Sequence, residues 1–293
     1  MSNRSVGRTR STFLAGLAVL LAAASQGCGA ALRVATQPSG IRESSTQVPL
    51  HGEPLTLHLL SPVDPRPSAP LVLYASGDGG WFGAAVGMFH TLARSGFPVV
   101  GVNTKALMHI EQRWSKPLTI AHVVHGYQQI IEAARATLQL APDAPVVLTG
   151  WSRGASLGVL VAVSPDADPN VLGLVAIGLS DEEQLDLAAL TDDDSGPAQP
   201  VDSTRDQREQ RPPPIAMYPL LSRMALKRSV VIQASGDHYL PAAQARALFG
   251  PDSPTRRFLT IDARNHRFNG GESAFSAALV EAVAWVSSGG EGI

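Results

Sequence analysis

Beyond residue 70 the chain alternates between short runs of apolar residues and longer stretches in which apolar positions recur with a helical period. The apolar runs predict strands at 71–75, 97–102, 145–149, 171–177, 229–234 and 257–261. The longer stretches predict helices at 81–94, 120–140, 152–163 and 272–286. Because strands that are apolar along their whole length must be covered on both sides, this order predicts a mostly parallel central sheet with helices on both faces.

The sequence before residue 70 predicts a less regular start to the domain. Residues 29–47 are rich in Ser, Thr, Gln and small residues, which is typical of a flexible tether. Residues 55–59 alternate between apolar and polar side chains, which predicts one early strand. We therefore expect the folded domain to span residues 48–293.

One long segment, 181–214, interrupts the alternation inside this domain. It contains three consecutive aspartates, several prolines and other charged residues, with almost no aromatic side chain. This composition does not favour a packed core, so we predict an inserted loop. Its place after the 171–177 strand is compatible with a lid over a site and equally with a disordered surface loop that has no role.

The first 28 residues predict a secretory signal peptide that is separate from the fold. Arg4, Arg8 and Arg10 supply a positive start, and residues 13–24 form an uninterrupted run of apolar and small residues. This run is shorter than the ~20 residues that a membrane-spanning helix needs. We therefore expect a bacterial protein that is exported from the cytoplasm.

Cys28 is the single cysteine of the chain and lies just after the apolar run. This is where a lipoprotein signal places its lipidated cysteine, so we predict a lipid anchor in the cell envelope. The alternative is an ordinary signal that is cut near residues 29–31, which would remove Cys28 and leave a periplasmic protein. In both cases the mature domain has no disulfide bond.

Composition and charge exclude some function classes. The chain has 293 residues, of which 44% are hydrophobic and 16% charged, with a formal net charge of -2. This is enough apolar content for a sizeable core, and the charge balance does not indicate binding to nucleic acid. His122 and His125 lie three apart on a predicted helix, but no acidic or cysteine cluster adjoins them in the sequence. We therefore predict neither a metal site nor a cofactor.

Candidate chemistry begins at the pentapeptide 150–154, Gly-Trp-Ser-Arg-Gly. It fits the pattern G-x-S-x-G and lies between a predicted strand and a predicted helix, which is the context of a nucleophile elbow. The glycines are needed because side chains at these positions would collide in so sharp a turn. Ser152 is therefore the candidate nucleophile, although a plain helix-capping serine would also fit a helix start.

A serine nucleophile needs a base and an acid, and in the fold that carries this elbow the chain order is serine, acid, histidine. Of the eight histidines only His238 and His266 follow Ser152. We predict His266 as the base, because it lies between the last predicted strand and the last helix. Asp237 directly follows the 229–234 strand and is the predicted acid, with Asp181 as the alternative. His238 is predicted to make a loop or lid contact.

The chemistry also needs hydrogen-bond donors for an oxyanion. One predicted donor is the backbone N–H of Arg153, the residue after the nucleophile. The second should come from the glycine-rich loop 76–81 after the first apolar strand, with Asp78 preferred and Gly79 next. We expect Trp81 and the Arg153 side chain to contact substrate, whereas core packing for Trp81 and a salt bridge for Arg153 are the alternatives.

With these motifs the sequence resembles the VirJ/AcvB family of bacterial virulence-associated proteins, over about residues 70–287. The resemblance rests on the loop 76–81, on the elbow 150–154, on the segment 235–237 and on the loop around His266. Trp151 and Arg153 stand where the family usually carries Tyr and Phe, and Asn103 stands where it often has Asp. The resemblance implies an exported domain of the α/β-hydrolase fold.

The resemblance further implies hydrolysis of an ester, with the aminoacyl ester of a membrane phospholipid, such as lysyl-phosphatidylglycerol, as one candidate. It also implies a link with envelope or secretion functions. Two rival hypotheses remain at this point. The chain could be a peptidase or a general esterase with the same three residues, or an inactive hydrolase-fold module that binds an envelope or secretion partner.

Overall fold

The computed structural model describes residues 40–114, 118–184, 213–224 and 227–288. The chain divides into an N-terminal unit, Met1–Ile41, and a compact unit, Arg42–Ile293, and the fold below is that of the second unit. The predicted signal peptide, Cys28 and most of the predicted inserted loop lie outside the described residues. Within the described ranges, no helix combines the length and the hydropathy that a membrane span requires.

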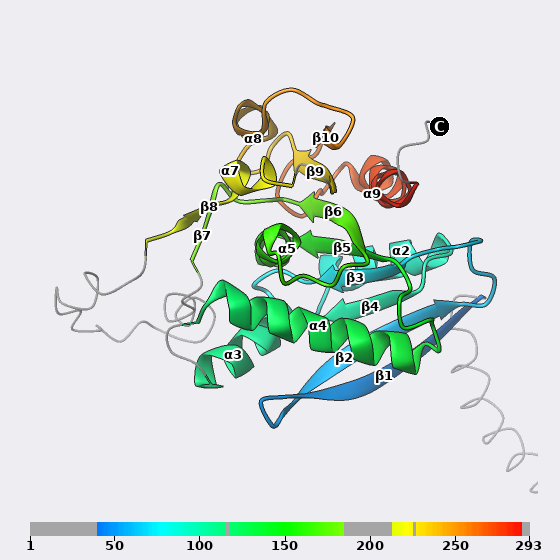
Figure 1. The fold of residues 1–293 in the computed structure, drawn as a ribbon. Coiled ribbons are helices and arrows are strands. Elements are labelled where there is room, and N and C mark those ends of the chain that lie inside the picture. The colour runs from blue at the N-terminus through cyan, green and yellow to red at the C-terminus, as the bar shows by residue number, and fades with distance from the viewer. Residues whose placement is uncertain (1–39, 115–117, 185–212, 225–226, 289–293) are drawn as a thin grey trace, which may run out of the picture. The chain divides into compact units, whose positions relative to one another are not determined.

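In the described part of the chain, eight strands form one sheet in the order β1-β2-β4-β3-β5-β6-β9-β10. Strand β2 runs antiparallel to β4, and every pair from β4 through β3 to β10 is parallel (Figure 1). The bounds are β1 (Ile41–Leu50), β2 (Glu53–Pro62), β3 (Leu71–Ala75), β4 (Val99–Val102), β5 (Val146–Trp151), β6 (Val171–Ile177), β9 (Arg228–Ala234) and β10 (Arg256–Ile261).

Helices cover both faces of this sheet, as the sequence pattern predicts. One face carries α2 (Ala84–Arg94) and α9 (Glu272–Ser287), which contact each other (Figure 1). The other face carries α3 (Thr104–Trp114), α4 (Ile120–Thr137), α5 (Arg153–Val163), α7 (Met217–Leu221) and α8 (Ala242–Phe249). The sheet therefore forms the middle of three layers, and the loops at the carboxyl ends of its parallel strands lie together at one edge.

The central strands hold the layers together because they are buried on both sides. Every residue of β3 is buried, and Leu71 and Leu73 belong to the core cluster that packs against α3, α4 and α5. Tyr74, on the opposite face, is fully buried beneath α2 and contacts Met88 of that helix. Each such side chain contributes about 1.5–3 kcal/mol relative to an exposed position.

The predicted tether is wrong over its last residues, because strand β1 begins at Ile41 rather than after residue 47. Only Val48 and Leu50 of this strand are buried, since β1 lies at the edge of the sheet and is mostly exposed. Such a strand has the composition of a tether. A tight turn at His51 and Gly52, both with positive φ, connects β1 to β2.

Two short strands close the base of the predicted insertion. In these, β7 (Glu182–Glu183) pairs antiparallel with β8 (Ile215–Ala216). The two ends of the predicted 181–214 loop are therefore joined to each other, and α7 follows β8 directly. The part of the insertion between residues 185 and 212 is outside the described residues, so the choice between a lid and a loop without a role stays a prediction.

Candidate active site

Ser152 occupies a sharp turn between β5 and α5, as the elbow motif predicts. Its backbone has φ 55° and ψ -124°, a combination that costs about 1–3 kcal/mol and is tolerated only where neighbouring structure enforces it. A Cβ on Gly150 would overlap the Gly154 carbonyl, and one on Gly154 would overlap the carbonyl of Ala75. Both glycines are therefore required by the close approach of backbone segments.

The Ser152 side chain is not used to cap the helix that follows it, because its hydroxyl makes no capping hydrogen bond with α5. Its backbone N–H instead donates to the Ile177 carbonyl at 2.8 Å, which fixes the turn against β6. The alternative of a helix-capping serine is therefore not supported. The hydroxyl is presented at the N-terminus of α5, where the helix dipole favours negative charge.

His266 and Asp237 form a short, buried pair. His266 Nδ1 lies 2.6 Å from Asp237 Oδ2, and the side chains are 9% and 0% exposed. Two further donors hold the carboxylate, since Gln233 Nε2 donates to Oδ2 at 3.1 Å and the Tyr239 backbone N–H donates to Oδ1 at 3.0 Å. Asp181, the alternative acid, is exposed and accepts a bond from the backbone of Glu182 instead.

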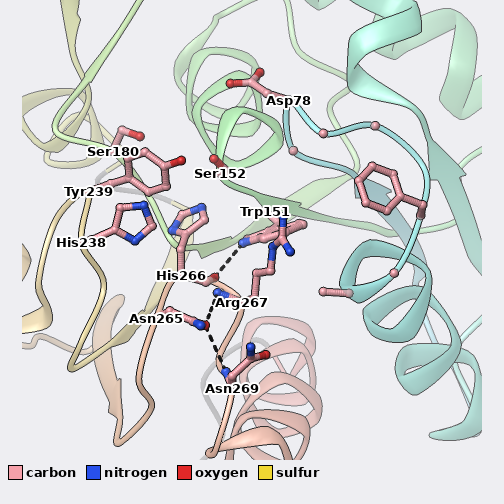
Figure 2. A pocket seen from close by; sticks show the side chains of 16 residues that line it. Asp78, Trp151, Ser152, Ser180, His238, Tyr239, Asn265, His266, Arg267 and Asn269 are labelled. Carbon is pink, nitrogen blue, oxygen red and sulfur yellow. Dashed lines mark hydrogen bonds between the residues drawn. The ribbon is translucent and has the colours of Figure 1, made fainter. Parts of the chain in front are cut away.

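The second ring nitrogen of His266 is buried and has no hydrogen-bond partner. The ring is held between Trp151, at a centroid distance of 5.5 Å, and Tyr239, at 5.0 Å. Trp151 Nε1 also donates to the His266 carbonyl at 3.2 Å (Figure 2). The other side is closed by Gly178, where a Cβ would lie only 2.6 Å from His266 Cε1. Because these contacts fix the ring, Nε2 has a fixed position although it makes no hydrogen bond.

Ser152 and His266 line one cavity of about 720 Å³ at the carboxyl ends of the strands. Figure 2 shows Ser152 in the middle of this cavity, with the Asp78 loop on one side and the His266 ring on the other. The remaining lining residues come from these same two loops, from the end of β5, from the loops after β6 and β9, and from the start of α2. They are Gly77, Gly79, Gly80, Phe82, Gly83, Ala84, Trp151, Ser180, His238, Tyr239, Asn265, Arg267 and Asn269.

The glycine-rich loop lies directly against Ser152. A Cβ on Gly77 would lie 3.2 Å from Ser152 Cβ, and the Gly80 N–H donates to the Gly77 carbonyl at 3.0 Å. This turn places Asp78 and Gly79 at its tip, and both line the cavity. The structure therefore brings the predicted nucleophile and both predicted loop donors together.

Trp81 is a prediction that the structure overturns. Its ring stacks on His58 at a centroid distance of 4.4 Å and meets the Phe89 edge at 5.0 Å, and it lies against Gly101 of β4. It does not line the cavity. The reason is that the loop turns at Gly80 and directs Trp81 over β2 and β4, so the alternative of core packing is correct. Phe82, the next residue, is 60% exposed and lines the cavity instead.

The Arg153 side chain is also not available to substrate. Its Nε forms an ion pair with Asp78 Oδ1 at 2.5 Å that lacks the geometry of a hydrogen bond. Its Nη1 lies 3.1 Å from Glu183 Oε1 and donates to the Gln184 carbonyl at 2.9 Å. Only 8% of the residue is exposed, and it does not line the cavity. The alternative of a salt bridge is confirmed. Burial raises the pKa of the Glu183 carboxyl, and the nearby Arg153 charge partly opposes this effect.

Several residues of the site were not predicted from the sequence. Gln233 holds Asp237 and also donates to the Leu240 carbonyl at 2.6 Å. It is the one amide side chain in the otherwise apolar run 230–234, and that polarity was a usable signal. Tyr239 and Phe82 carried no such signal, because an exposed aromatic residue in a loop has no distinctive sequence pattern. His238, predicted as a loop or lid contact, lines the cavity, and its ring is tilted against that of Tyr239 at a centroid distance of 4.0 Å.

A known family matches the part of the chain that contains Ser152. Residues 70–184 match the family model VirJ, described as bacterial virulence protein. The predicted resemblance to the VirJ family is confirmed over these residues. The VirJ segment contains the glycine-rich loop and the elbow, whereas Asp237 and His266 follow it in the chain. The comparison with curated proteins gives no match.

The VirJ segment is part of a larger α/β-hydrolase fold. The esterase domain of a Rhodothermus marinus protein is 16% identical with a TM-score of 0.54, over 84% of this chain and 98% of that one. A putative dienelactone hydrolase from Klebsiella pneumoniae is 12% identical with a TM-score of 0.57, over 85% and 100%. Est1E from Butyrivibrio proteoclasticus is 13% identical with a TM-score of 0.55, over 85% and 99%. The predicted fold class is therefore confirmed.

No metal centre accompanies the site in the described residues. Within these ranges, no three histidine, cysteine or acidic side chains are grouped so that they could hold a metal ion. The chemistry available at the cavity is that of an unengaged serine hydroxyl, a buried imidazole and backbone N–H groups.

Proposed function

We propose that this protein is a serine hydrolase that cleaves carboxylic esters, with Ser152 as nucleophile, His266 as base and Asp237 as acid. One observation carries the proposal. His266 is bonded through Nδ1 to a buried carboxylate, and its buried Nε2 has no hydrogen-bond partner. His266 and Ser152 line the same cavity. A histidine held in this way is oriented and charge-stabilised through one nitrogen and is free to accept a proton at the other.

In the proposed reaction, His266 Nε2 takes the Ser152 hydroxyl proton while Oγ attacks the ester carbonyl carbon. The backbone N–H groups of Arg153 and of Asp78 or Gly79 stabilise the resulting oxyanion. Collapse breaks the bond to the alcohol, which leaves with the proton from His266. Water then gives a proton to His266 and attacks the acyl-enzyme, and the acid is released as Ser152 recovers its proton. Asp237 keeps the ring oriented throughout.

The substrate class that the VirJ resemblance suggests is the aminoacyl ester of a membrane phospholipid. Two features of the cavity support a substrate as large as a phospholipid ester. The cavity of about 720 Å³ has room for more than a short acyl group, and the exposed rings of Phe82 and Tyr239 line it. The predicted anchor at Cys28 would hold the site in the envelope near such lipids, because a lipoprotein carries enough acyl chains for stable attachment.

The first test is labelling of the purified protein with a fluorophosphonate probe, beside Ser152→Ala. We expect labelling of the wild type and none of the variant. Turnover of lysyl-phosphatidylglycerol in vesicles, compared with a short p-nitrophenyl ester, then tests the substrate class. A folded wild type that neither labels nor hydrolyses any ester would refute the hydrolase proposal and favour a binding module for an envelope partner.

A further inference from the structure

The side chain of Arg153 connects the glycine-rich loop 76–81 to α5 and β7. It is the first residue of α5, directly after Ser152, and its guanidinium is buried between two carboxylates. Asp78 belongs to the glycine-rich loop, and Glu183 belongs to β7. The same guanidinium donates to the carbonyl of Gln184, so it is held on its far side by two groups.

The glycine-rich loop has little else to fix its tip. Asp78 is the only residue of the turn 77–80 that has a side chain, because the other three are glycines. Glycines leave the backbone conformationally free, so a turn of this composition needs an external anchor to hold one geometry. Figure 2 shows the Asp78 carboxylate directed toward α5 and not down toward Ser152, in agreement with its ion pair to Arg153.

Anchoring through Asp78 determines where the backbone of that residue lies. Its N–H belongs to the same residue as the held carboxylate, and the preceding Gly77 lies so close to Ser152 that an added Cβ would be 3.2 Å from Ser152 Cβ. The base of the loop is fixed separately, because Ser76 N–H donates to Val102 and Ser76 Oγ accepts from the Thr104 N–H at 3.1 Å. The ion pair with Arg153 therefore supplies a side-chain anchor at the tip.

We propose that Arg153 is a positioning residue, which holds the Asp78 carboxylate so that the Asp78 backbone N–H is preorganised as an oxyanion donor beside Ser152. This inference rests on the proposed hydrolase function. Arg153 then has two separate roles. Its own backbone N–H is one donor, and its side chain places the other. Glu183 and Gln184 keep the guanidinium in place from the side of β7.

The test uses kcat and KM for a p-nitrophenyl ester in Arg153→Met, Asp78→Ala and the double variant. All three keep every backbone N–H, so the proposed oxyanion donors themselves are not removed, and Asp78→Ala breaks the anchor without removing the contacts of Arg153 with Glu183 and Gln184. We expect each single change to lower kcat by about 10–100-fold with KM nearly unchanged, since the donor acts on the transition state. The double variant should be no slower than either single one, because both changes break the same contact.

Arg135→Met is the matched control. Arg135 is 5% exposed and pairs with Asp168 at 2.6 Å, near the amino ends of β5 and β6 and away from the cavity. It should lower the melting temperature and leave kcat of the folded protein unchanged. If Arg153→Met does not fold, Arg153→Lys replaces it, because a single ammonium keeps the charge and loses the two-sided grip, and kcat should still fall.

The outcomes separate this inference from the proposed function. A folded wild type that shows no labelling and no turnover refutes both the hydrolase proposal and the positioning role of Arg153. Active wild type with unchanged kcat in a folded Arg153 variant overturns only the positioning role. The same conclusion follows if the effects of Arg153→Met and Asp78→Ala multiply in the double variant, or if Arg135→Met lowers kcat equally.

Discussion

The described part of the chain contains two histidine–carboxylate pairs with little solvent exposure, and their difference shows what makes such a pair a candidate site. His266 Nδ1 lies 2.6 Å from Asp237, and His51 Nε2 lies 3.0 Å from Glu111. The exposure of the four side chains is similar, at 9% and 0% in the first pair and 11% and 1% in the second. Burial and distance therefore do not distinguish them.

The pairs differ in which partner is left with an unused atom. In the first pair the carboxylate is fully held by Gln233 and by the Tyr239 N–H, and the histidine has the free nitrogen. In the second pair Glu111 Oε1 lacks a partner, while the His51 ring is covered by Trp114 at 3.9 Å. His266 has a free proton acceptor in a cavity that Ser152 also lines, which is the arrangement that nucleophilic catalysis needs. His51 lies at the turn between β1 and β2, and its contacts with Trp114 and Glu111 attach this turn to α3.

The largest expected contrast is between His266→Ala and His51→Ala. His266→Ala should lower kcat by about 10⁶-fold, as loss of the base does in serine hydrolases that act through a triad. His51→Ala should leave kcat within about twofold of the wild type and lower the free energy of unfolding by about 2–3 kcal/mol, because Glu111 loses its partner. Ester turnover and urea unfolding measure the two effects. Equal losses of kcat would show that the two pairs are not functionally distinct.

The second contrast lies in the two carboxylates. Asp237→Asn preserves the shape but allows the wrong tautomer of His266, so kcat should fall by about 10⁴-fold. Glu111→Ala should destabilise the protein by about 3 kcal/mol with kcat unchanged, because it leaves a cavity and removes the partner of His51. Asp181→Asn serves as the control for the alternative acid, and a large loss of kcat there would contradict the assignment of Asp237.

A glycine adjoins each pair and gives a third contrast of smaller size. Gly178→Ala would place a Cβ 2.6 Å from His266 Cε1, which displaces the ring, and kcat should fall by about 100-fold. Gly126→Ala would place a Cβ 2.9 Å from Glu111 Oε1, the movable end of a side chain, so kcat should not change. Steady-state kinetics on both variants would test this, and an equal response would argue that ring position is not critical.

The elements that could be predicted from the sequence are those whose burial is complete. The 71–75 and 171–177 strands match β3 and β6 to the residue, because an apolar run buried on both faces has one interpretation. Strand β1 was missed because an edge strand keeps polar side chains, and α3 was missed because its buried face includes Thr104 and Glu111 among its apolar residues. Composition does not separate such elements from loops.

The features of the candidate site also differ in how far the sequence could predict them. The elbow at Ser152 and the pairing of His266 with Asp237 follow from local turns and from chain order, so the sequence was sufficient to place them together. The orientations of Trp81 and Arg153 were wrong, because they depend on partners such as His58 and Glu183 that are distant in sequence. Side-chain direction in a loop is set by tertiary contacts, and a single sequence does not contain those.

The smallest expected effect concerns Glu183, a third buried carboxylate that belongs to neither histidine pair. Burial raises its pKa in the folded protein above the ordinary value of 4.5, so the folded state holds this proton more strongly than the unfolded chain does. Its stabilising contribution is therefore complete below pH 4.5 and is lost as the pH rises through the raised pKa. Glu183→Gln cannot titrate and should lack this pH dependence.

Urea unfolding of wild type and Glu183→Gln from pH 4.5 to pH 8 measures the effect. The free energy of unfolding of the wild type, relative to the variant, should decrease as the pH rises and then level off above the raised pKa. The levelling point locates the pKa. A constant difference across this range would mean that the Arg153 charge fully offsets the effect of burial on the Glu183 pKa. Glu183 would then be a carboxylate held by its partner, as Asp237 is, and not one with an unpartnered oxygen, as Glu111 is.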